Sequence, residues 1–159
     1  MPAEIIHGSP LGNLYISSYG NNITCISFNE KEITNGKDPV IEECCRQLDE
    51  YFSGKRRKFD ISTDQQGTEF QKNVWSCLCN IEYGKTASYH NLSKELGNVK
   101  AIRAVGNANG KNNIAIVIPC HRVIGTNGDL VGYAGKLWRK KWLLEHEAKI
   151  AHGIQTLFV

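Results

Sequence analysis

The longest apolar run in the chain, residues 114–118 ("IAIVI"), leads directly into Pro119, Cys120 and His121. Five consecutive β-branched and alanine residues predict a buried β-strand, which would have to pass through the core of any fold. Adjacent residues of a straight strand point to opposite faces, whereas Pro119 predicts a turn. The sequence therefore leaves open whether Cys120 and His121 touch, and whether they are packing residues or a reactive pair on a rigid strand.

A cysteine needs a proton acceptor to react at neutral pH, because the thiolate is the nucleophile and a free thiol has a pKa of about 8.5. His121 could take that proton directly or through a bridging water. A third group should orient the imidazole. Glu147, in a helix predicted over residues 142–150, is the candidate for that group.

The first third of the chain predicts a small α+β unit. Residues 11–17 and 22–28 resemble strands joined by a hairpin turn. Asp38 and Pro39 predict the start of a helix that ends at Gly54, since Asp is a good N-cap and Pro fits the first helical position. Residues 55–62 ("KRRKFDIS") could form an edge strand, and the polar stretch 62–67 is predicted to be a linker.

The remainder predicts helices. Thr68 and Gln71 form a capping box that begins one helix, and Ser88 caps a second that ends at Gly97. Asn98 caps a third helix at once. Two short helices joined by such a tight turn indicate a helix-turn-helix, although most helical hairpins share this pattern.

The third helix is rich in small residues: Ala101, Ala104, Gly106 and Ala108. Small side chains allow close approach either to another helix or to a DNA groove. Arg103 is the one long side chain that could enter the groove, because arginine combines a charge for phosphate with a flat face that can stack.

Charge and cysteine usage add weaker evidence. Residues 1–62 carry a net charge of −2 and residues 63–159 a net charge of +5, which modestly favours a polyanionic partner for the second part. The six cysteines show no CxxC spacing, so we expect free thiols and no zinc site. No signal peptide or membrane span is evident, which predicts a soluble, cytoplasmic protein.

Several motifs in fixed order resemble one family. "KAIRAVGNANGKNNIA", "IVIPCHRVIG", "GYAGK" and "WLLEHE" closely resemble the O6-alkylguanine-DNA alkyltransferases (methylated-DNA–protein-cysteine methyltransferases) over residues 68–149. The N-terminal third resembles them only loosely, through "SPLG". The resemblance implies an α+β protein. A small ribonuclease-H-like α/β scaffold domain (1–62) would precede a mainly helical, winged-helix-like domain with a helix-turn-helix (63–159).

The resemblance also implies roles for individual residues. Cys120 would accept the alkyl group from O6 of guanine, or from O4 of thymine, with His121 (through a water) and Glu147 as its activating relay. Tyr89 would donate a proton to the leaving base, and Asn112 would tie the DNA-binding helices to the active-site segment. Arg103 would replace the flipped nucleotide. The other DNA- or base-binding positions are Ser88, Ala101, Ala104, Gly106, Val123, Tyr133 and Ala134.

Two positions depart from the family pattern. Asn113 stands where proline usually follows the hinge asparagine, and Lys136 stands where the "GYxGG" loop usually ends in glycine. Lys136 puts the width and charge of the pocket rim in doubt. Lys140 matches a common family lysine, but could equally be a solvated charge.

The implied activity is a single transfer to Cys120 that inactivates the protein, with no cofactor and no metal. The implied partner of the monomer is double-stranded DNA bound through its minor groove, with the target base flipped out of the stack. Three alternatives remain: a winged-helix regulator with Cys120 as a redox sensor, a cysteine hydrolase, and an alkyltransferase-like protein that binds lesions without repairing them.

Overall fold

The structure is a computed structural model that describes residues 2–29, 33, 36, 38–125, 127–130 and 132–153. The chain divides into two compact units. The sheet unit comprises residues 1–65 and 113–117, and the helical unit comprises residues 66–112 and 118–159. The chain therefore leaves the helical unit after Asn112, contributes five residues to the sheet unit, and returns at Ile118.

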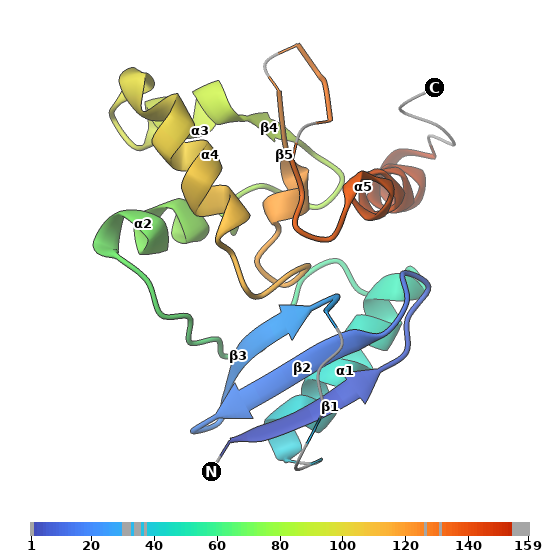
Figure 1. The fold of residues 1–159 in the computed structure, drawn as a ribbon. Helices are drawn as coiled ribbons and strands as arrows, with labels where there is room; N and C mark the ends of the chain where they lie inside the picture. Colours follow the sequence, from blue (N-terminus) through green and yellow to red (C-terminus); the bar gives the residue numbers. More distant parts are fainter. Residues whose placement is uncertain are drawn as a thin grey trace. The chain divides into compact units, whose positions relative to one another are not determined.

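The sheet unit is built on three antiparallel strands in the order β1 (Ala3–His7), β2 (Leu14–Tyr19) and β3 (Asn22–Ser27). Helix α1 (Pro39–Phe52) packs against all three strands (Figure 1). Gly20 and Asn21 both have positive φ (57° and 67°), as a tight hairpin turn with the twist of its strands requires. The predicted β2–β3 hairpin is confirmed, whereas β1 was not predicted.

Helix α1 begins where the sequence predicts. The side chain of Asp38 accepts a hydrogen bond from the backbone N–H of Ile41 (2.8 Å), and Pro39 occupies the first helical turn. Ile41, Cys44 and Leu48 lie on the buried side, since their spacing places them on one face of the helix. Local capping and periodicity together determine this element.

The edge strand predicted over residues 55–62 is wrong. Gln47 of α1 binds the backbone of Asp60 in both directions, accepting from its N–H (2.8 Å) and donating to its carbonyl (3.0 Å). These groups are therefore not available to a strand ladder. This segment meets the sheet just after its end, at an isolated parallel bridge between Ile23 and Thr63.

The strand predicted over residues 114–118 is also wrong, although the run is buried as expected. It makes a single parallel bridge, between Ile114 and Ile26, with hydrogen bonds from Ile26 N to Asn113 O and from Ala115 N to Ile26 O. At Ile116 the backbone adopts a φ of 72°, which is incompatible with an extended strand. The run is thus a buried turn that ends beside Pro119.

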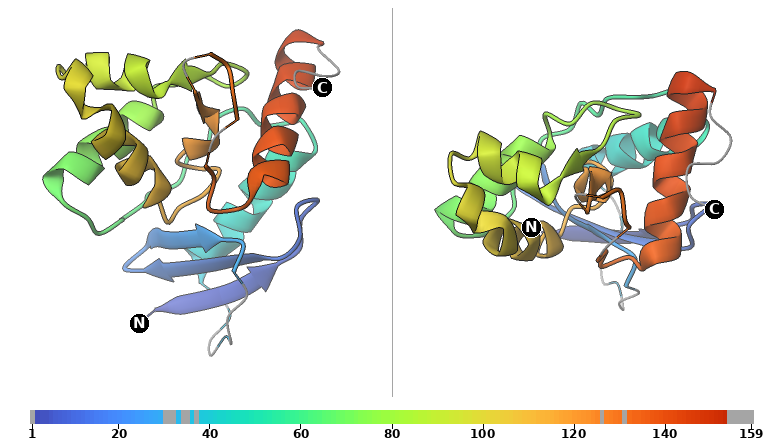
Figure 2. Two further views of the ribbon diagram at one scale, coloured as in Figure 1. Left: turned by 45° about the horizontal axis from the view of Figure 1, so that its top comes forward. Right: turned by 90° about the horizontal axis from the view of Figure 1, so that it is seen from above.

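The helical unit begins with α2 (Glu69–Leu78), whose predicted Thr68–Gln71 capping box is present. A helix-turn-helix follows, made of α3 (Tyr89–Glu95), the short 3₁₀ turn η1 (Val99–Ala101) and α4 (Ile102–Gly110), with α3 packed against α4 (Figure 2). The indole N–H of Trp75 in α2 donates to the carbonyl of Ala108 (2.9 Å) and so fixes the end of α4.

The rest of the helical unit holds the predicted reactive stretch. The 3₁₀ turn η2 (Cys120–Arg122) leads into β5 (Val123–Ile124), which pairs in parallel with β4 (Ala87–Ser88). The last element is α5 (Leu137–His152), which begins five residues before the predicted helix and packs against η2. Strands, helices and helix-turn-helix confirm the predicted α+β class.

Candidate active site

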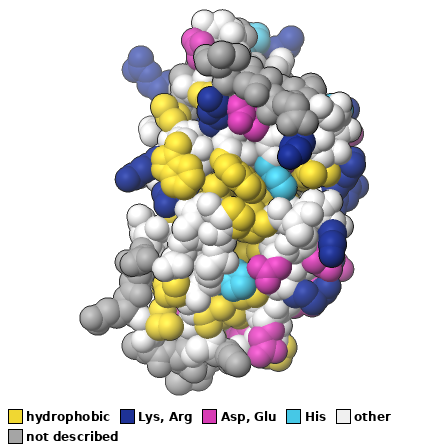
Figure 3. Space-filling model, turned by 90° about the vertical axis from the view of Figure 1, so that its right-hand side faces the viewer, with side chains coloured by type: hydrophobic (Ala, Val, Ile, Leu, Met, Phe, Trp, Pro, Cys, Tyr) yellow, Lys and Arg dark blue, Asp and Glu magenta, His cyan; other side chains and the backbone are white. Residues whose placement is uncertain are grey.

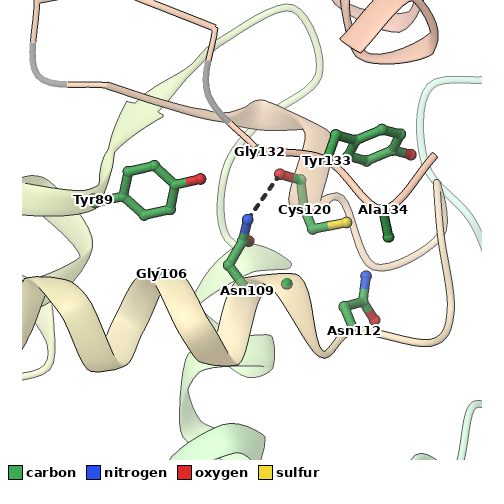
Figure 4. Close-up of a pocket in the computed structure, with 9 residues that line it drawn as sticks. Tyr89, Gly106, Asn109, Asn112, Cys120, Gly132, Tyr133 and Ala134 are labelled. Atoms are coloured by element: carbon green, nitrogen blue, oxygen red, sulfur yellow. Dashed lines mark hydrogen bonds between the residues drawn. The ribbon is translucent and has the colours of Figure 1, made fainter. Parts of the chain in front are cut away.

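A pocket in the helical unit encloses about 500 Å³ of empty space, its open mouth included. Segments far apart in the sequence converge on it: the start of α3, the end of α4, turn η2 and the loop before α5. In Figure 4 the sulfur of Cys120 points toward the side formed by Asn112 and Ala134, and its carbonyl faces Asn109. The lining residues are Tyr89, Gly106, Asn109, Gly110, Asn112, Cys120, Gly132, Tyr133 and Ala134.

Turn η2 holds Cys120 in a defined place. The N–H of Cys120 donates to the carbonyl of Ile118 (2.8 Å), and the N–H of Arg122 donates to the carbonyl of Pro119 (3.0 Å). The side chain of Asn112 donates to the same Ile118 carbonyl (2.9 Å). Asn112 therefore ties the end of the α4 segment to the backbone that carries the thiol.

The surroundings of Cys120 favour the thiol over the thiolate. Burial raises its pKa, and this effect exceeds the opposing effects of a hydrogen bond from Asn112 and the positive charge of Lys140. The two opposing groups stabilise the thiolate more than the thiol. The site therefore needs a proton acceptor, but it already contains the groups that would stabilise the thiolate once formed.

His121 is completely buried and forms a 2.7 Å hydrogen bond from Nε2 to Oε2 of Glu147. Burial lowers the pKa of His121, and the neighbouring Glu147 only partly opposes that shift. In a neutral imidazole bonded to a carboxylate, Nε2 carries the proton and Nδ1 is an acceptor. This Nδ1 is buried and has no hydrogen-bond partner among the described residues, so His121 retains a free basic atom.

Glu147 is an ionised carboxylate inside the protein. Burial alone would raise its pKa, but His121 and Arg122 lower it well below its usual range. Arg122 donates to both carboxylate oxygens, from Nε at 2.8 Å and from Nη2 at 3.0 Å. A buried charge is tolerated when it is paired and fully hydrogen-bonded, and Arg122 provides that pairing.

A tight loop completes the cluster around Glu147. The N–H of Gly84 donates to Oε1 of Glu147 (3.3 Å), and Nη1 of Arg122 donates to the carbonyl of Ile81 (2.6 Å). Gly84 has a φ of 78°, and a Cβ there would lie 2.6 Å from the Cβ of Ala151 in α5. Only glycine allows this loop to approach α5 closely enough to reach the carboxylate.

Lys140 is completely buried, which excludes the solvated-charge interpretation. Its Nζ lies 3.4 Å from the carbonyl of Gly132 in the pocket lining. Burial lowers the pKa of Lys140 to about 8, against the attraction of Cys120. The cation thus belongs to the electrostatic surroundings of the thiol.

The predicted site residues divide into two groups. The first group lies at the pocket, which is lined by Tyr89, Gly106, Asn112, Cys120, Tyr133 and Ala134. Behind the pocket lie the buried side chains of His121 and Glu147. Val123 is buried in β5 and does not line the pocket. Ser88 caps α3 with its hydroxyl, and the remaining three positions lie outside the pocket on η1 and α4: Ala101, Arg103 and Ala104.

Sequence reasoning did not assign roles to Asn109, Gly110, Gly132 or Arg122. Asn109 follows Gly106 by three residues, so helical periodicity places both on the same side of α4 and could have indicated it. Arg122 lies within the "PCHRV" motif, but nothing local indicates that its guanidinium turns inward. Burial and the partner on α5 determine its place.

The surface gives less information than the pocket. On the face displayed in Figure 3, the Lys and Arg side chains of the described residues are interspersed with acidic and uncharged ones and form no continuous basic surface. No described helix is both long and apolar enough to cross a bilayer. Within the described ranges, no three His, Cys, Asp or Glu side chains gather in a way that could hold a metal ion.

Comparison with known proteins identifies both parts of the chain. Residues 69–149 match the model of the 6-O-methylguanine DNA methyltransferase DNA-binding domain, and residues 5–65 match that of its ribonuclease-like domain. A methylated-DNA–protein-cysteine methyltransferase of Methanosarcina acetivorans is 43% identical over 149 residues, which cover 89% of this chain and 96% of the relative.

Solved structures agree with this match. The O6-methylguanine methyltransferase of Mycobacterium tuberculosis superposes with a TM-score of 0.86 at 40% identity over 95% of both chains. A second structure, described as the M. tuberculosis OGT in complex with DNA, superposes with a TM-score of 0.85 at 41% identity over 94% of both chains.

Proposed function

This chain belongs to the O6-methylguanine DNA methyltransferase family, and we propose that it repairs DNA by transferring an alkyl group from O6 of guanine to its own Cys120. One observation supports this choice of acceptor above the others. Cys120 lines a pocket whose wall also carries Tyr89, and the buried His121–Glu147 pair lies on the same turn and the adjoining helix. Thiol, base and orienting carboxylate are the parts that nucleophilic catalysis requires.

In the proposed reaction, the Cys120 thiol gives its proton through a water to Nδ1 of His121, and Glu147 stabilises the imidazolium. The thiolate attacks the alkyl carbon, so that a carbon–sulfur bond forms as the bond from carbon to O6 breaks. The electron pair stays on the guanine. Tyr89 donates a proton to a ring nitrogen of the departing base, which makes guanine a better leaving group.

DNA is bound through the helix-turn-helix. The small residues Ala101, Ala104 and Gly106 allow η1 and α4 to approach the minor groove closely, and Ser88 lies at the start of the neighbouring helix. Arg103, which is exposed, enters the stack where the target nucleotide has left it. Extrusion of the base costs a few kcal/mol and brings O6, or O4 of an alkylated thymine, to the thiol.

We assign the remaining parts supporting roles. Asn112 joins the end of the DNA-binding helix to the active-site turn, through its bond to the carbonyl of Ile118. Tyr133 and Ala134 close the base pocket, and Val123 supports it from β5. Residues 1–62 act as a scaffold for the domain that begins at residue 63, and the protein works as a cytoplasmic monomer.

The product is a thioether, which the groups of the site cannot hydrolyse, so each molecule acts once. This separates the proposal from a cysteine hydrolase, which would turn over. The presence of Cys120 together with a basic partner separates it from lesion-binding relatives that do not repair. A redox regulator would require no base pocket beside the thiol.

Peptide mass spectrometry tests the proposal. The protein is mixed with duplex DNA that carries O6-methylguanine, digested, and weighed peptide by peptide. We expect methyl on the Cys120 peptide, at no more than one equivalent per protein, and none in the Cys120→Ser variant. Methyl on any of the other five cysteines, or more equivalents of repaired DNA than protein, would refute the mechanism.

A further inference from the structure

Gln65 is a buried polar residue that the proposed mechanism does not use. It is 8% exposed and follows the segment beside β3, in which the N–H of Asp64 donates to the carbonyl of Ile23 (2.9 Å). The side-chain oxygen of Gln65 accepts a hydrogen bond from the backbone N–H of Asn113, a residue 48 positions later in the chain. Both residues belong to the sheet unit. A buried amide is costly unless it is hydrogen-bonded, and the Asn113 N–H satisfies the oxygen of this one.

The N–H that Gln65 binds belongs to the peptide group that joins Asn112 to Asn113. A peptide group is planar, so a partner on this N–H also restrains the carbonyl and the Cα of Asn112. The next peptide group is bonded as well, because the carbonyl of Asn113 accepts from the N–H of Ile26 in β3 (2.9 Å). Both peptide groups that flank the Asn113 Cα are therefore held within the sheet unit.

Asn112 connects this restraint to the thiol. Its Nδ2 donates to the carbonyl of Ile118 (2.9 Å), and a hydrogen bond from Asn112 opposes the rise in the pKa of Cys120. Figure 4 shows the Asn112 amide on the side of the pocket toward which the sulfur of Cys120 points. A rotation of the peptide group after Asn112 would move this amide relative to both of its partners.

Asn113 is one of the two positions at which the chain departs from the family pattern, which usually has proline there. Proline has no N–H, so it would leave the Gln65 oxygen without this donor. Proline instead restricts the preceding residue to extended backbone conformations, and would restrain Asn112 directly. The bond between Gln65 and Asn113 thus supplies by hydrogen bonding a restraint that proline builds into the covalent chain.

We propose that Gln65 is a positioning residue for alkyl transfer, which holds the amide of Asn112 beside Cys120 through the N–H of Asn113. This inference rests on the proposed function. Gln65 acts through the backbone on the group that stabilises the thiolate, and takes no direct part in the chemistry. Its loss should therefore slow the transfer step and leave the affinity for DNA unchanged.

Rates of Cys120 methylation test the proposal. The single-turnover rate is measured over a range of concentrations of duplex DNA that carries O6-methylguanine, which separates the limiting rate from the half-saturating concentration. Gln65→Leu keeps the approximate size of the side chain but removes the acceptor. We expect it to lower the limiting rate by about fivefold or more, since small misplacements of groups at a reacting centre cost at least this much. The half-saturating concentration should change by less than about twofold, because no phosphate contact is altered.

Asn113→Pro provides the decisive comparison. It removes the N–H, so adding Gln65→Leu to this variant should slow transfer by less than about twofold. Asn113→Pro alone should react within about twofold of the unaltered protein, since proline restrains Asn112 by itself. Gln66→Leu, at the adjacent exposed position, is the matched control and should keep the unaltered rate. The final yield of methylated Cys120 reports the folded fraction of each variant.

Two results would overturn the inference. One is a Gln65→Leu protein that is less stable to urea but transfers methyl at the unaltered limiting rate, because Gln65 would then only stabilise the fold. The other is an equal slowing by Gln65→Leu, or a loss of all activity, both with and without Asn113→Pro, because the effect would then not pass through this N–H. Absence of methyl on Cys120 in the unaltered protein would instead refute the proposed function itself.

Discussion

Arg122 holds Glu147 by two buried hydrogen bonds, one to each carboxylate oxygen. His121 binds the same carboxylate, so three charged or chargeable side chains share one buried cluster. Burial lowers the pKa of His121, and the positive charge of Arg122 lowers it further, so the cluster favours the neutral imidazole. A neutral His121 is the form that can take a proton from Cys120.

Arg122→Met should destabilise the protein strongly. It leaves the Glu147 carboxylate buried without its cation, a change that typically costs 3–5 kcal/mol. Glu147→Gln should also lower the free energy of unfolding, because it leaves the Arg122 guanidinium buried without its anion. The double variant should lose much less unfolding free energy than the two single variants together, since it leaves neither charge buried alone. Urea unfolding of the four proteins measures this coupling.

An exposed group of ion pairs on α1 provides the control for this comparison of single and double variants. Arg46 binds Glu43 and Glu50 on α1, but its side chain is 55% exposed. Arg46→Met should therefore cost about 1 kcal/mol or less. Two outcomes would show that the buried pairing does not stabilise this cluster. One is an equal loss of unfolding free energy in Arg46→Met and Arg122→Met, and the other is strict additivity of the two losses in the double variant.

Lys140 predicts a conflict between stability and activity. Burial lowers its pKa from 10.5 to about 8, so between these pH values the unfolded chain holds a proton that the folded protein has released. Stability therefore rises with pH across that window, and below pH 8 the folded protein carries a disfavoured buried charge. Lys140→Met should raise the unfolding free energy at pH 7 by about 1–3 kcal/mol. This gain should shrink as the pH approaches 10.5.

The same substitution should slow transfer to Cys120 by about tenfold or more at pH 7, because the thiolate loses a nearby cation. Lys141→Met is the matched control, since the neighbouring lysine has a 42% exposed side chain. It should change stability by no more than about 0.5 kcal/mol. A Lys140→Met protein that is less stable, or that reacts at the unaltered rate, would contradict this role.

Elements with local signals were predictable from the sequence, and elements fixed by distant contacts were not. The caps formed by Asp38, Thr68 and Ser88 lie within three residues of the N–H groups that they bind, so sequence reasoning located three helix starts. The run at 114–118 was misassigned because its backbone bonds to β3, about ninety residues earlier, and turns at Ile116. No local pattern contains that information.

The site shows the same division. Cys120, His121 and Tyr89 stand in motifs whose chemistry can be recognised from residue type and spacing. The importance of Arg122 and Lys140 arises from burial, because each would be an ordinary polar residue if it faced water. Their partners lie on other elements, and only the folded chain brings them together.

Lys136 tests whether the departure from the family glycine carries a structural cost. It begins α5 at φ 73° and ψ 152°, a backbone region that is nearly exclusive to glycine. Lys136→Gly should therefore stabilise the protein by about 1 kcal/mol, after the added flexibility of the unfolded chain is counted. Lys136→Ala keeps the strain and removes the charge, so it should give no gain. Equal thermal stabilisation by both variants would instead assign the cost to the charge of this exposed side chain.

Arg103→Ala tests how the base reaches the pocket. Arg103 is exposed and is not among the residues that line the pocket of the thiol, so it is placed to act on the DNA. If it occupies the space of the extruded nucleotide, its loss should slow repair of O6-methylguanine in duplex DNA by about tenfold or more. Reaction with the free base O6-methylguanine, which needs no extrusion, should change by less than about twofold. The rate of Cys120 methylation is measured in parallel with the two substrates. Equal losses of rate would show that Arg103 acts on the chemistry or the fold and takes no part in base extrusion.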